Sequence, residues 1–426
     1  MSVRQSRGER GLGPLADGGT VVVVGGGPGG TACAIALKRL AHELGCNIEV
    51  VLYEGKRFDG TPQYNQCAGV LSPPIVQIVE EGLRIPFPWE LVQRQISGYV
   101  LHSARQEILL RRAGVLSFAL RRVTFDAYLL SKARESGVEV IQSRMTGVEF
   151  SDDWVMVYSE SDNRKADVVI GAFGLDDGTA KIFERATRYR RPAFIGTIVT
   201  KIHPGERFMA RFGDHIHAFL PPHRQIEFGA VTPKSNHITV NIAGKRVDSA
   251  LMNAFLRFAP LREILPAGFN PRKDELLYFK GKFPFGVSRA FYGDRYVVVG
   301  DAAGLLRPFK GKGVNMGLAS GIAAAETIMK AGISRAALEM HYRQTFRNVI
   351  GDLPYGKLVR WLAIKSSKTG FLDVALDLAR EQRPVARALF DCVSAHRSFK
   401  SILFETLDLG LLLKTLRVWL RSRLIR

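Results

Sequence analysis

The hydrophobic pattern near the N-terminus predicts a β-α-β unit. Residues 20–24 form a short apolar run rich in β-branched side chains, which is typical of a buried parallel strand. A glycine cluster follows, and the alanine-rich stretch 31–44 then shows the apolar spacing of a helix that ends at Gly45. Residues 48–53 predict a second buried strand. The chain therefore begins as a doubly wound α/β fold.

The pattern changes twice further along the chain. A helix over 124–136 and strands over 138–142 and 166–172 continue the opening pattern. From about 185 to 285 alternating strands, such as 194–202 and 237–242, are separated by turns that contain proline and glycine. These predict an inserted β-rich domain.

The C-terminal third returns to the opening pattern and then becomes helical. A short buried strand over 296–299 leads through a glycine-rich passage into a helix that continues through Ala324. Beyond Lys330 the sequence predicts helices with three breaks, at 351–354, Gly370 and Pro384.

These patterns divide the chain into five predicted segments. They are a flexible tail (1–18), the first part of a nucleotide-binding domain (19–184), a β-rich substrate domain (185–290), the second part of the nucleotide-binding domain (291–330) and a basic helical region (331–426).

The charge balance favours anionic partners. The 426 residues include 60 Lys and Arg against 40 Asp and Glu, a net charge of +20, and +10 of it lies from Lys330 onward. Nucleic acid, an anionic lipid surface and a phosphate-bearing substrate are the candidates. Because the sequence has no zinc-finger spacing, RNA-binding signature or basic region with heptads, we do not expect nucleic acid.

Composition also bounds the location of the protein. No apolar run is long enough to span a bilayer, and the first apolar run leads into glycines and not into a signal-peptide cleavage site. The four cysteines form no C-x-x-C pair, so reduced thiols are expected. We therefore expect a cytoplasmic protein that binds at most peripherally to the inner face of the membrane.

A glycine motif marks a dinucleotide site. Gly25-x-Gly27-x-x-Gly30, with Gly29 inside it, follows a strand and opens a helix, so its backbone amides could meet a pyrophosphate. Glu54, at the end of the second strand, is placed to accept hydrogen bonds from an adenosine ribose. This fingerprint alone leaves nicotinamide and flavin cofactors open.

A second glycine motif favours the flavin. Residues 297–304, with Gly300 and Asp301, followed by Gly313 and Val314, resemble the late motif of FAD-dependent oxidoreductases of the aromatic-hydroxylase and geranylgeranyl-reductase superfamily. The resemblance implies a glutathione-reductase-type Rossmann-like domain that binds FAD. In that superfamily the residue matching Asp301 binds the ribityl chain or pyrophosphate, and those matching Gly313 and Val314 lie against the isoalloxazine. The alternative is that Asp301 only caps a helix.

Two further segments are similar to the same superfamily. Arg122, in R-V-T-F-D, matches an arginine that contacts FAD, and Thr146 matches a backbone contact that flanks the adenine. Phe173 replaces the aspartate of the usual G-A-D-G segment, and this replacement argues against hydroxylation as the activity.

Residues 66–69 indicate the branch. Cys67, Ala68 and Gly69 resemble the cysteine-glycine segment of geranylgeranyl reductases, whose backbone lies near the flavin and whose cysteine is linked to activity. Cys67 could donate a proton or shape the pocket. The alternative, a buried small hydrophobe, is what we expect of Cys33 on the first helix.

Other positions depart from that branch. The aromatic Y-x-W-x-F-P strand of geranylgeranyl reductases aligns with 216–221, where only the proline remains. Lys312 and Asn315 stand in a loop that is more similar to hydroxylases.

Two patterns have alternative interpretations. His215 and His217 would share one face of a strand, as a metal pair or as polar residues on a sheet or pocket surface, and the missing ligands favour the second. The leucines and basic residues of 409–426 form an amphipathic helix that suits either the protein's own body or an anionic membrane.

The leading hypothesis is an FAD-dependent oxidoreductase that reduces carbon-carbon double bonds of an isoprenoid or other apolar lipid. No second dinucleotide fingerprint follows the first, so the electron donor would be transiently bound NAD(P)H or another external reductant. The alternatives are a flavin monooxygenase acting on an apolar substrate and a membrane-docked flavoprotein that passes electrons to a quinone.

Overall fold

A six-stranded sheet forms the first layer of the computed structural model, which describes residues 11–57, 67–271, 275–307 and 312–406. Its strand order is β18-β19-β12-β1-β2-β8, parallel throughout except for the edge strand β18. The strands are β1 (Thr20–Val24), β2 (Glu49–Tyr53), β8 (Glu139–Ile141), β12 (Val168–Gly171), β18 (Tyr292–Gly293) and β19 (Tyr296–Val298).

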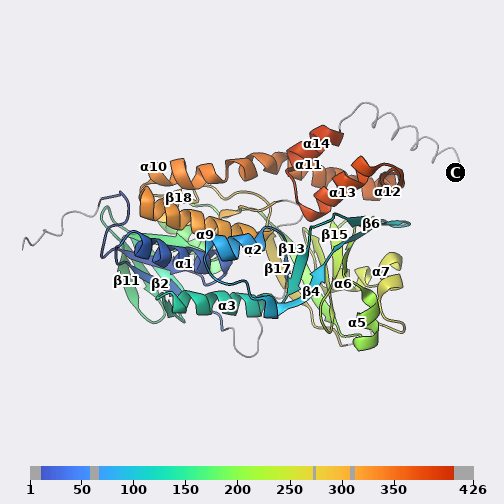
Figure 1. The fold of residues 1–426 in the computed structure, drawn as a ribbon, viewed down its shortest axis with the longest axis horizontal. Helices are drawn as coiled ribbons and strands as arrows, with labels where there is room; N and C mark the ends of the chain where they lie inside the picture. The colour runs from blue at the N-terminus through green and yellow to red at the C-terminus, as the bar shows by residue number, and fades with distance from the viewer. Residues whose placement is uncertain (1–10, 58–66, 272–274, 308–311, 407–426) are drawn as a thin grey trace, which may run out of the picture.

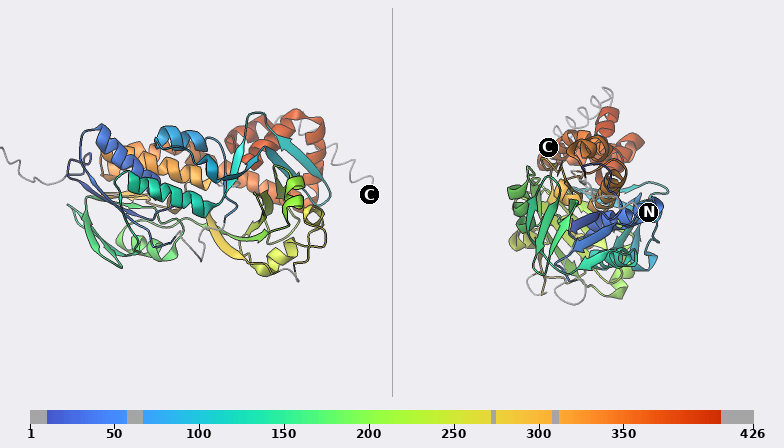
Figure 2. Two further views of the ribbon diagram at one scale, coloured as in Figure 1. Left: turned by 60° about the horizontal axis from the view of Figure 1, so that its bottom comes forward. Right: turned by 90° about the vertical axis from the view of Figure 1, so that its left-hand side faces the viewer.

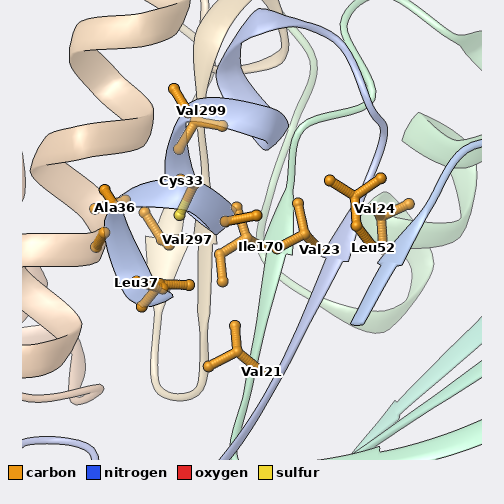
Figure 3. Close-up of a cluster of buried hydrophobic side chains, with 14 of the residues drawn as sticks. Val21, Val23, Val24, Cys33, Ala36, Leu37, Leu52, Ile170, Val297 and Val299 are labelled. Atoms are coloured by element: carbon orange, nitrogen blue, oxygen red, sulfur yellow. The ribbon is translucent and has the colours of Figure 1, made fainter. Parts of the chain in front are cut away.

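Helices α1 (Pro28–Glu43) and α9 (Gly313–Lys330) pack side by side on this sheet, and α3 (Arg122–Glu135) packs beside α1 (Figure 1). Glycines allow the close approach of α1 and α9, because a Cβ on Gly321 would lie 2.3 Å from the carbonyl oxygen of Gly29. Figure 3 shows Cys33 of α1 among Val23, Ile170 and Val297 of the sheet. Cys33 is fully buried in this core, so its predicted role as a buried hydrophobe is confirmed, and burial raises its pKa.

Two small sheets and several short helices complete this half of the molecule. Their strand orders are β11-β10-β9 and β3-β7-β4. The strands are β3 (Val70–Leu71), β4 (Val92–Ile96), β7 (Ser117–Leu120), β9 (Met145–Phe150), β10 (Val155–Ser159) and β11 (Asn163–Ala166). The helices are α2 (Ile75–Gln77), η1 (Ile78–Gly82), η2 (Trp89–Leu91), α4 (Asp177–Ala186) and α8 (Gly300–Ala303).

A seven-stranded sheet forms the second half, in the order β17-β13-β16-β15-β14-β5-β6. Its strands are β5 (Gly98–His102), β6 (Glu107–Arg111), β13 (Phe194–Ile202), β14 (His215–Phe219), β15 (Phe228–Pro233), β16 (Ile238–Gly244) and β17 (Phe279–Pro284). Because β5 pairs in parallel with β14, residues 98–111 belong to this sheet. The sheet is therefore not confined to the predicted segment 185–290.

The two faces of the second sheet are covered differently. Helices α5 (Glu206–Phe212), α6 (Ser249–Phe255) and α7 (Ala259–Ile264) cover one face and bury Phe255 and Leu261 against it. C-terminal helices cover the other face, where Leu372 and Phe390 pack with Tyr99 and Leu101. Figures 1 and 2 show these helices gathered at one end of the elongated molecule, above the second sheet.

The C-terminal region consists of α10 (Arg335–Ala337), η3 (Leu338–Arg343), α11 (Arg347–Thr369), α12 (Phe371–Glu381), α13 (Arg383–Ser394) and α14 (Phe399–Thr406). Breaks at Gly370 and Pro384 are confirmed, because Gly370 ends α11 in the left-handed conformation and Pro384 lies in the first turn of α13. The predicted break at 351–354 is wrong. Helix α11 continues through Pro354, and its Asp352 carboxylate accepts hydrogen bonds from the amides of Phe399 (2.9 Å) and Lys400 (2.8 Å), which ties it to α14.

An ion pair fastens α11 to the second sheet. Buried Arg360 places its Nε 2.8 Å from Oε2 of Glu227, and its guanidinium lies over the rings of Phe228 and Phe285.

Among the described helices, none is long and apolar enough to cross a bilayer.

A buried histidine pair joins β5 to β14. Nε2 of His102 lies 2.9 Å from Nδ1 of His217. Burial lowers the pKa of His102 to about 4 and that of His217 to about 3, where the neighbouring histidines contribute. Between the unfolded pKa of about 6.5 and pH 4, the unfolded chain therefore binds protons that the folded chain does not.

We expect the free energy of unfolding to fall as the pH drops from 7 to 5. Each histidine contributes at most about 1.4 kcal/mol per pH unit below 6.5. Urea unfolding at the two pH values measures this slope. The double variant His102→Gln and His217→Gln should have a shallower slope, and an unchanged slope would show that other groups cause the acid sensitivity.

Candidate active site

The glycine loop between β1 and α1 brings two segments of backbone close together. Gly25 has a φ of +111°, and a Cβ there would lie 2.4 Å from the carbonyl oxygen of Ala172. A Cβ on Gly30 would lie 1.9 Å from the carbonyl oxygen of Gly25. In contrast, a Cβ on Gly27 would meet no atom within 4 Å. Open space therefore lies in front of Gly27 at the N-terminus of α1, where a helix offers unpaired amides to an anion.

Glu54 lies directly after β2 and stabilises this loop. Its Oε2 accepts a hydrogen bond from the amide of Gly26 at 2.8 Å, and its Oε1 accepts one from the amide of Lys56 at 2.7 Å. The same side chain lines a cavity of about 350 Å³ between the ends of β2 and β8 and helix α3. Lys56, Leu130 and Gln142 line it as well.

Asp301 lies where α8 and the start of α9 meet. Gly300 before it has a φ of +63° and donates its amide to Oγ of Ser320 at 2.9 Å. A Cβ on Gly313 would lie 3.3 Å from Oδ1 of Asp301, so the carboxylate faces the first turn of α9. Burial raises the pKa of Asp301, and Arg122 acts in the opposite direction.

Arg122 begins α3 and contacts Asp126 and Cys67. Its Nη2 lies 2.9 and 3.1 Å from the two carboxylate oxygens of Asp126. Its Nη1 lies 4.0 Å from Sγ of Cys67. Although burial opposes the shift, Asp126, Cys67 and Asp301 raise the pKa of Arg122. The guanidinium therefore stays charged, and its positive charge acts on both Cys67 and Asp301.

Residues 67–69 border a large cavity, with the Cys67 side chain exposed. Gly69 adopts a φ of +65°, and a Cβ there would lie 2.0 Å from the carbonyl oxygen of Leu120. That oxygen also accepts a hydrogen bond from Nζ of Lys234, a buried residue that follows β15. The close contact of Gly69 with the Leu120 backbone, together with the buried Lys234, therefore holds residues 67–69 in place.

The large cavity has a volume of about 1290 Å³ and a polar end. Cys67, Ala68, Gly69, Arg122, Asp301, Gly313 and Val314 all line that end. The remainder lies between the second sheet and helices α11–α14, and is lined mainly by apolar side chains such as Leu101, Ala218, Leu362, Phe371 and Leu389.

The structure therefore brings most of the predicted site residues together. Seven line one cavity, and the glycine loop adjoins them because Gly29 packs against Gly317 and Val299 beside Gly300. Thr146 is the exception: it lies exposed on β9 and lines neither of the two cavities described above.

At two positions where this sequence departs from the family pattern, the structure explains the residue present. Phe173, in place of the usual aspartate, packs against Phe183 at a ring distance of 4.9 Å and against Tyr189 at 5.8 Å. Asn315 donates its side-chain amide to the carbonyl oxygen of Ser72 at 2.8 Å, which ties α9 to β3.

Sequence reasoning missed Lys234, because nothing around it in the chain marks a buried lysine. Burial lowers its pKa to about 8; Cys67 opposes this shift, and Lys201, Arg121 and Arg122 add to it. Sequence reasoning also missed that helices α11–α14 line the large cavity with apolar side chains. The sequence of an amphipathic helix does not identify the surface against which the helix packs.

The histidines of the second sheet have partners other than a metal. His215 accepts a hydrogen bond from Nε of Arg111 at 2.8 Å, and His217 pairs with His102. No group of three or more His, Cys, Asp or Glu side chains suited to a metal ion occurs in the part of the chain that the structure describes.

Known proteins similar to this chain include named reductases. No protein-family model matches it. It is 28% identical over 330 residues to digeranylgeranylglycerophospholipid reductase 1 of Methanopyrus kandleri, covering 73% of this chain and 80% of that protein. It is 25% identical over 336 residues to the chloroplastic geranylgeranyl diphosphate reductase of Arabidopsis thaliana, covering 73% of this chain and 65% of that protein.

Solved structures share the fold. A geranylgeranyl bacteriochlorophyll reductase-like protein of Thermoplasma acidophilum superimposes with a TM-score of 0.68 at 18% identity, over 92% of this chain and 99% of that one. A flavin-dependent halogenase superimposes with a TM-score of 0.59 at 21% identity, over 79% of this chain and 63% of that one. The fold is thus that of flavin-dependent enzymes, and over most of its length this chain is a distant homologue of the geranylgeranyl reductases.

Proposed function

We propose that this protein is an FAD-dependent oxidoreductase that reduces carbon-carbon double bonds of an isoprenoid or other apolar lipid. One observation carries the proposal: a single large cavity joins a polar end at Cys67, Arg122 and Asp301 to a long apolar compartment. A predominantly apolar cavity with a few convergent polar groups is typical of a small-molecule site. Its apolar part suits a lipid chain better than a polar metabolite.

The residues present fit FAD. Gly27 leaves room for a pyrophosphate in front of the α1 amides. Glu54, beside the 350 Å³ cavity, would hold the adenosine ribose, and Asp301 would accept hydrogen bonds from the ribityl hydroxyls. Gly313 and Val314, at the start of α9, would present backbone to the flavin ring. Bound flavin would supply the hydride. Its electrons would come from transiently bound NAD(P)H or another external donor.

The chain's own residues would bind the lipid, exclude water and hold a proton at the polar end of the cavity. Leu101, Ala218, Leu362 and Phe371 would enclose the apolar chain and keep the polar end dry. Sγ of Cys67 borders that end and would hold a proton there, with Arg122 and Lys234 as its charged neighbours.

For Cys67→Ala we expect bound FAD but slower turnover, because the substitution removes the thiol and leaves the glycine loop and Asp301 in place. FAD content by absorbance and turnover of the lipid substrate measure the two effects. Cys67→Ser, which keeps a hydroxyl of similar size, should retain more activity than Cys67→Ala. Unchanged turnover in both variants would give Cys67 a packing role only.

Membrane access is part of the proposal, and helix α11 supports it. Its Leu358, Trp361 and Leu362 are 46%, 55% and 44% exposed, and Trp361, Leu362 and Lys365 also line the cavity. Apolar and aromatic side chains flanked by lysines suit an anionic bilayer surface. The amphipathic segment 409–426, for which we also propose a membrane role at the inner face, lies outside the described residues.

We expect the protein to co-sediment with anionic vesicles more strongly than with neutral ones. Binding should weaken as salt shortens the Debye length from about 10 Å at 0.1 M to about 3 Å at 1 M. Trp361→Ser and deletion of 409–426 should each weaken it, whereas Trp154→Ser, in a turn of the other half, serves as the matched control. Equal binding to both vesicle types would contradict a membrane role.

The proposal is tested by identifying what the protein carries. Denaturation should release FAD, and lipid extracts of the purified protein should contain isoprenoid chains, both detected by mass spectrometry. A protein that releases no FAD and gains no thermal stability from added FAD would overturn it. Oxygen uptake coupled to substrate would instead indicate a monooxygenase, and turnover only with an added quinone would indicate an electron carrier.

A further inference from the structure

Strand β16 carries a polar side chain into the apolar part of the large cavity. Alternate residues of a strand project to opposite faces of the sheet. Val240 and Ile242, on either side of Asn241, pack in the core shared with helices α5–α7, so Asn241 projects to the other face and lines the cavity. Opposite Asn241 in register lie Val199 of β13 and Ala230 of β15, which line the cavity as well. The amide of Asn241 therefore lies between apolar neighbours on both sides.

The carbonyl oxygen of this amide has no hydrogen-bond partner among the described residues. Oδ1 of Asn241 is buried and accepts no hydrogen bond from them. Buried polar atoms in folded proteins almost always have a partner, and asparagine is depleted in strands, where apolar β-branched residues are favoured. An asparagine at this position is therefore unfavourable for folding unless a molecule in the cavity bonds to it. A ligand with a hydrogen-bond donor would supply that partner.

Thr232 extends this polar feature toward the Cys67 end of the cavity. It lines the cavity, is 1% exposed, and lies on β15 opposite Thr239, which is two residues before Asn241 on β16. Diagonal neighbours of this kind project from one face, with Cα atoms about 7 to 8 Å apart. One ligand oxygen between the two side chains can therefore reach both the amide of Asn241 and the hydroxyl of Thr232.

The charged side chains of this part of the sheet contact other groups. Nζ of Lys201 lies 6.0 Å from the ring centre of Phe279 on β17, on the side of β13 away from β16. Lys282, which lines the cavity, pairs with Asp177 at 2.5 Å. Burying a charged ligand group among apolar side chains without a charged partner is costly. The surroundings of Asn241 therefore favour an uncharged ligand group.

We propose that Asn241, together with Thr232, binds an uncharged hydroxyl group of the lipid in the cavity. The inference rests on the proposed function, which it deepens by naming a hydroxylated lipid as the substrate class. A hydroxyl group both donates and accepts hydrogen bonds, so it can bond to either end of a side-chain amide. A site built to bond a hydroxyl group discriminates against the analogue that lacks it, because the polar groups of the site are then left without partners.

Binding of two lipids to the FAD-loaded full-length protein tests the inference. The probes are geranylgeraniol and the hydrocarbon that lacks only its hydroxyl group, titrated in the same detergent. We expect the wild-type protein to bind the alcohol at least about tenfold more tightly, the scale of one or two hydrogen bonds. Asn241→Leu replaces the amide by an apolar group of similar size. In this variant the alcohol should lose its advantage, and the hydrocarbon should bind at least as tightly as before.

Thr197→Val is the matched control. Thr197 lines the same cavity, but its Oγ1 already donates a hydrogen bond to the carbonyl oxygen of Ile242 at 2.8 Å. Its replacement should leave the preference for the alcohol intact, whereas Thr232→Val should reduce the preference in part. Thermal unfolding without lipid adds a second measurement. Asn241→Leu should unfold at or above the wild-type midpoint, because the Oδ1 that it removes has no partner among the described residues.

Equal binding of the two lipids by the wild-type protein would overturn the inference, because the amide would then meet solvent and not the ligand. So would a wild-type preference in Asn241→Leu, or an equal loss of preference in Thr197→Val. Asn241→Ala repeats both measurements without a branched side chain. A midpoint well below that of the wild type in both Asn241 variants would assign the amide to the fold and would also overturn the inference.

The outcomes for this inference and for the proposed function are distinguishable. A protein that retains FAD and reduces a geranylgeranyl lipid, but binds the alcohol and the hydrocarbon equally, disproves this inference and leaves the proposed function intact. Absence of FAD from the wild type would instead disprove the function.

Discussion

Gly30→Ala should destabilise the protein by at least about 3 kcal/mol, whereas Gly27→Ala should leave it folded but weaken FAD binding at least about tenfold. A Cβ on Gly30 would lie 1.9 Å from the carbonyl oxygen of Gly25, and backbone atoms on both sides leave little room to adjust. A Cβ on Gly27 meets nothing within 4 Å, and Gly27 has an extended φ of −75° that alanine adopts readily. The added methyl group would instead occupy the space proposed for the pyrophosphate.

Urea unfolding of the FAD-free proteins and FAD titration measure the two effects separately. Each variant is the control for the other, because both add one methyl group within four residues of the same loop. If Gly27→Ala bound FAD as tightly as the wild type, the space before Gly27 would not hold the cofactor. If Gly30→Ala were as stable as the wild type, the close approach at this turn would not be a constraint on the fold.

The second large effect is expected at the two carboxylates. Asp301→Ala and Glu54→Ala should each weaken FAD binding by about 1.5 to 3 kcal/mol, the range for hydrogen bonds to charged groups, which is tenfold or more in affinity. Asp301→Ala should stay folded, because Arg122 keeps its two-oxygen contact with Asp126. Glu54→Ala should also lose some stability, since the amides of Gly26 and Lys56 lose their acceptor.

Fluorescence titration of FAD measures both affinities. Glu54→Gln and Asp301→Asn, which keep the side-chain shape, separate loss of charge from loss of packing. Asp153→Asn, an exposed residue in the β9–β10 turn, controls for a general change in net charge. Wild-type affinity in both alanine variants would remove these residues from the proposed cofactor site.

The local sequence was sufficient to predict the strands and the helix around the glycine loop. Strand β1 has its predicted bounds, β2 begins one residue later than predicted, and α1 begins three residues earlier and ends one residue earlier than predicted. The strand β1 is an apolar β-branched run buried on both faces, and it is followed by Gly25 and Gly30, where a Cβ would clash with backbone atoms. This combination leaves few alternatives. Cys67, Arg122 and Asp301 were predicted through a resemblance, and the structure places them at one end of one cavity.

Long-range pairing was not accessible to the same reasoning. Strand β5 lies beside β14 although more than a hundred residues separate them, and the polar and apolar pattern of β5 does not identify its partner. Lys234 is a site candidate only because the end of β15 approaches Gly69 in space. Pro354 predicted a break, but packing of α11 against α14 and the Arg360–Glu227 ion pair support a continuous helix. The predicted domain boundaries stay predictions.

The most direct test of the proposed activity is one anaerobic turnover. The FAD-loaded protein is reduced chemically, freed of excess reductant and mixed with a geranylgeranyl lipid, and both the flavin absorbance and the mass of the lipid are followed. We predict that the oxidised flavin spectrum returns without oxygen and that the lipid gains two hydrogen atoms for each FAD oxidised. A flavin that stays reduced beside an unchanged lipid, or a lipid that is modified only when air is admitted and then gains oxygen, would contradict the proposed reductase activity.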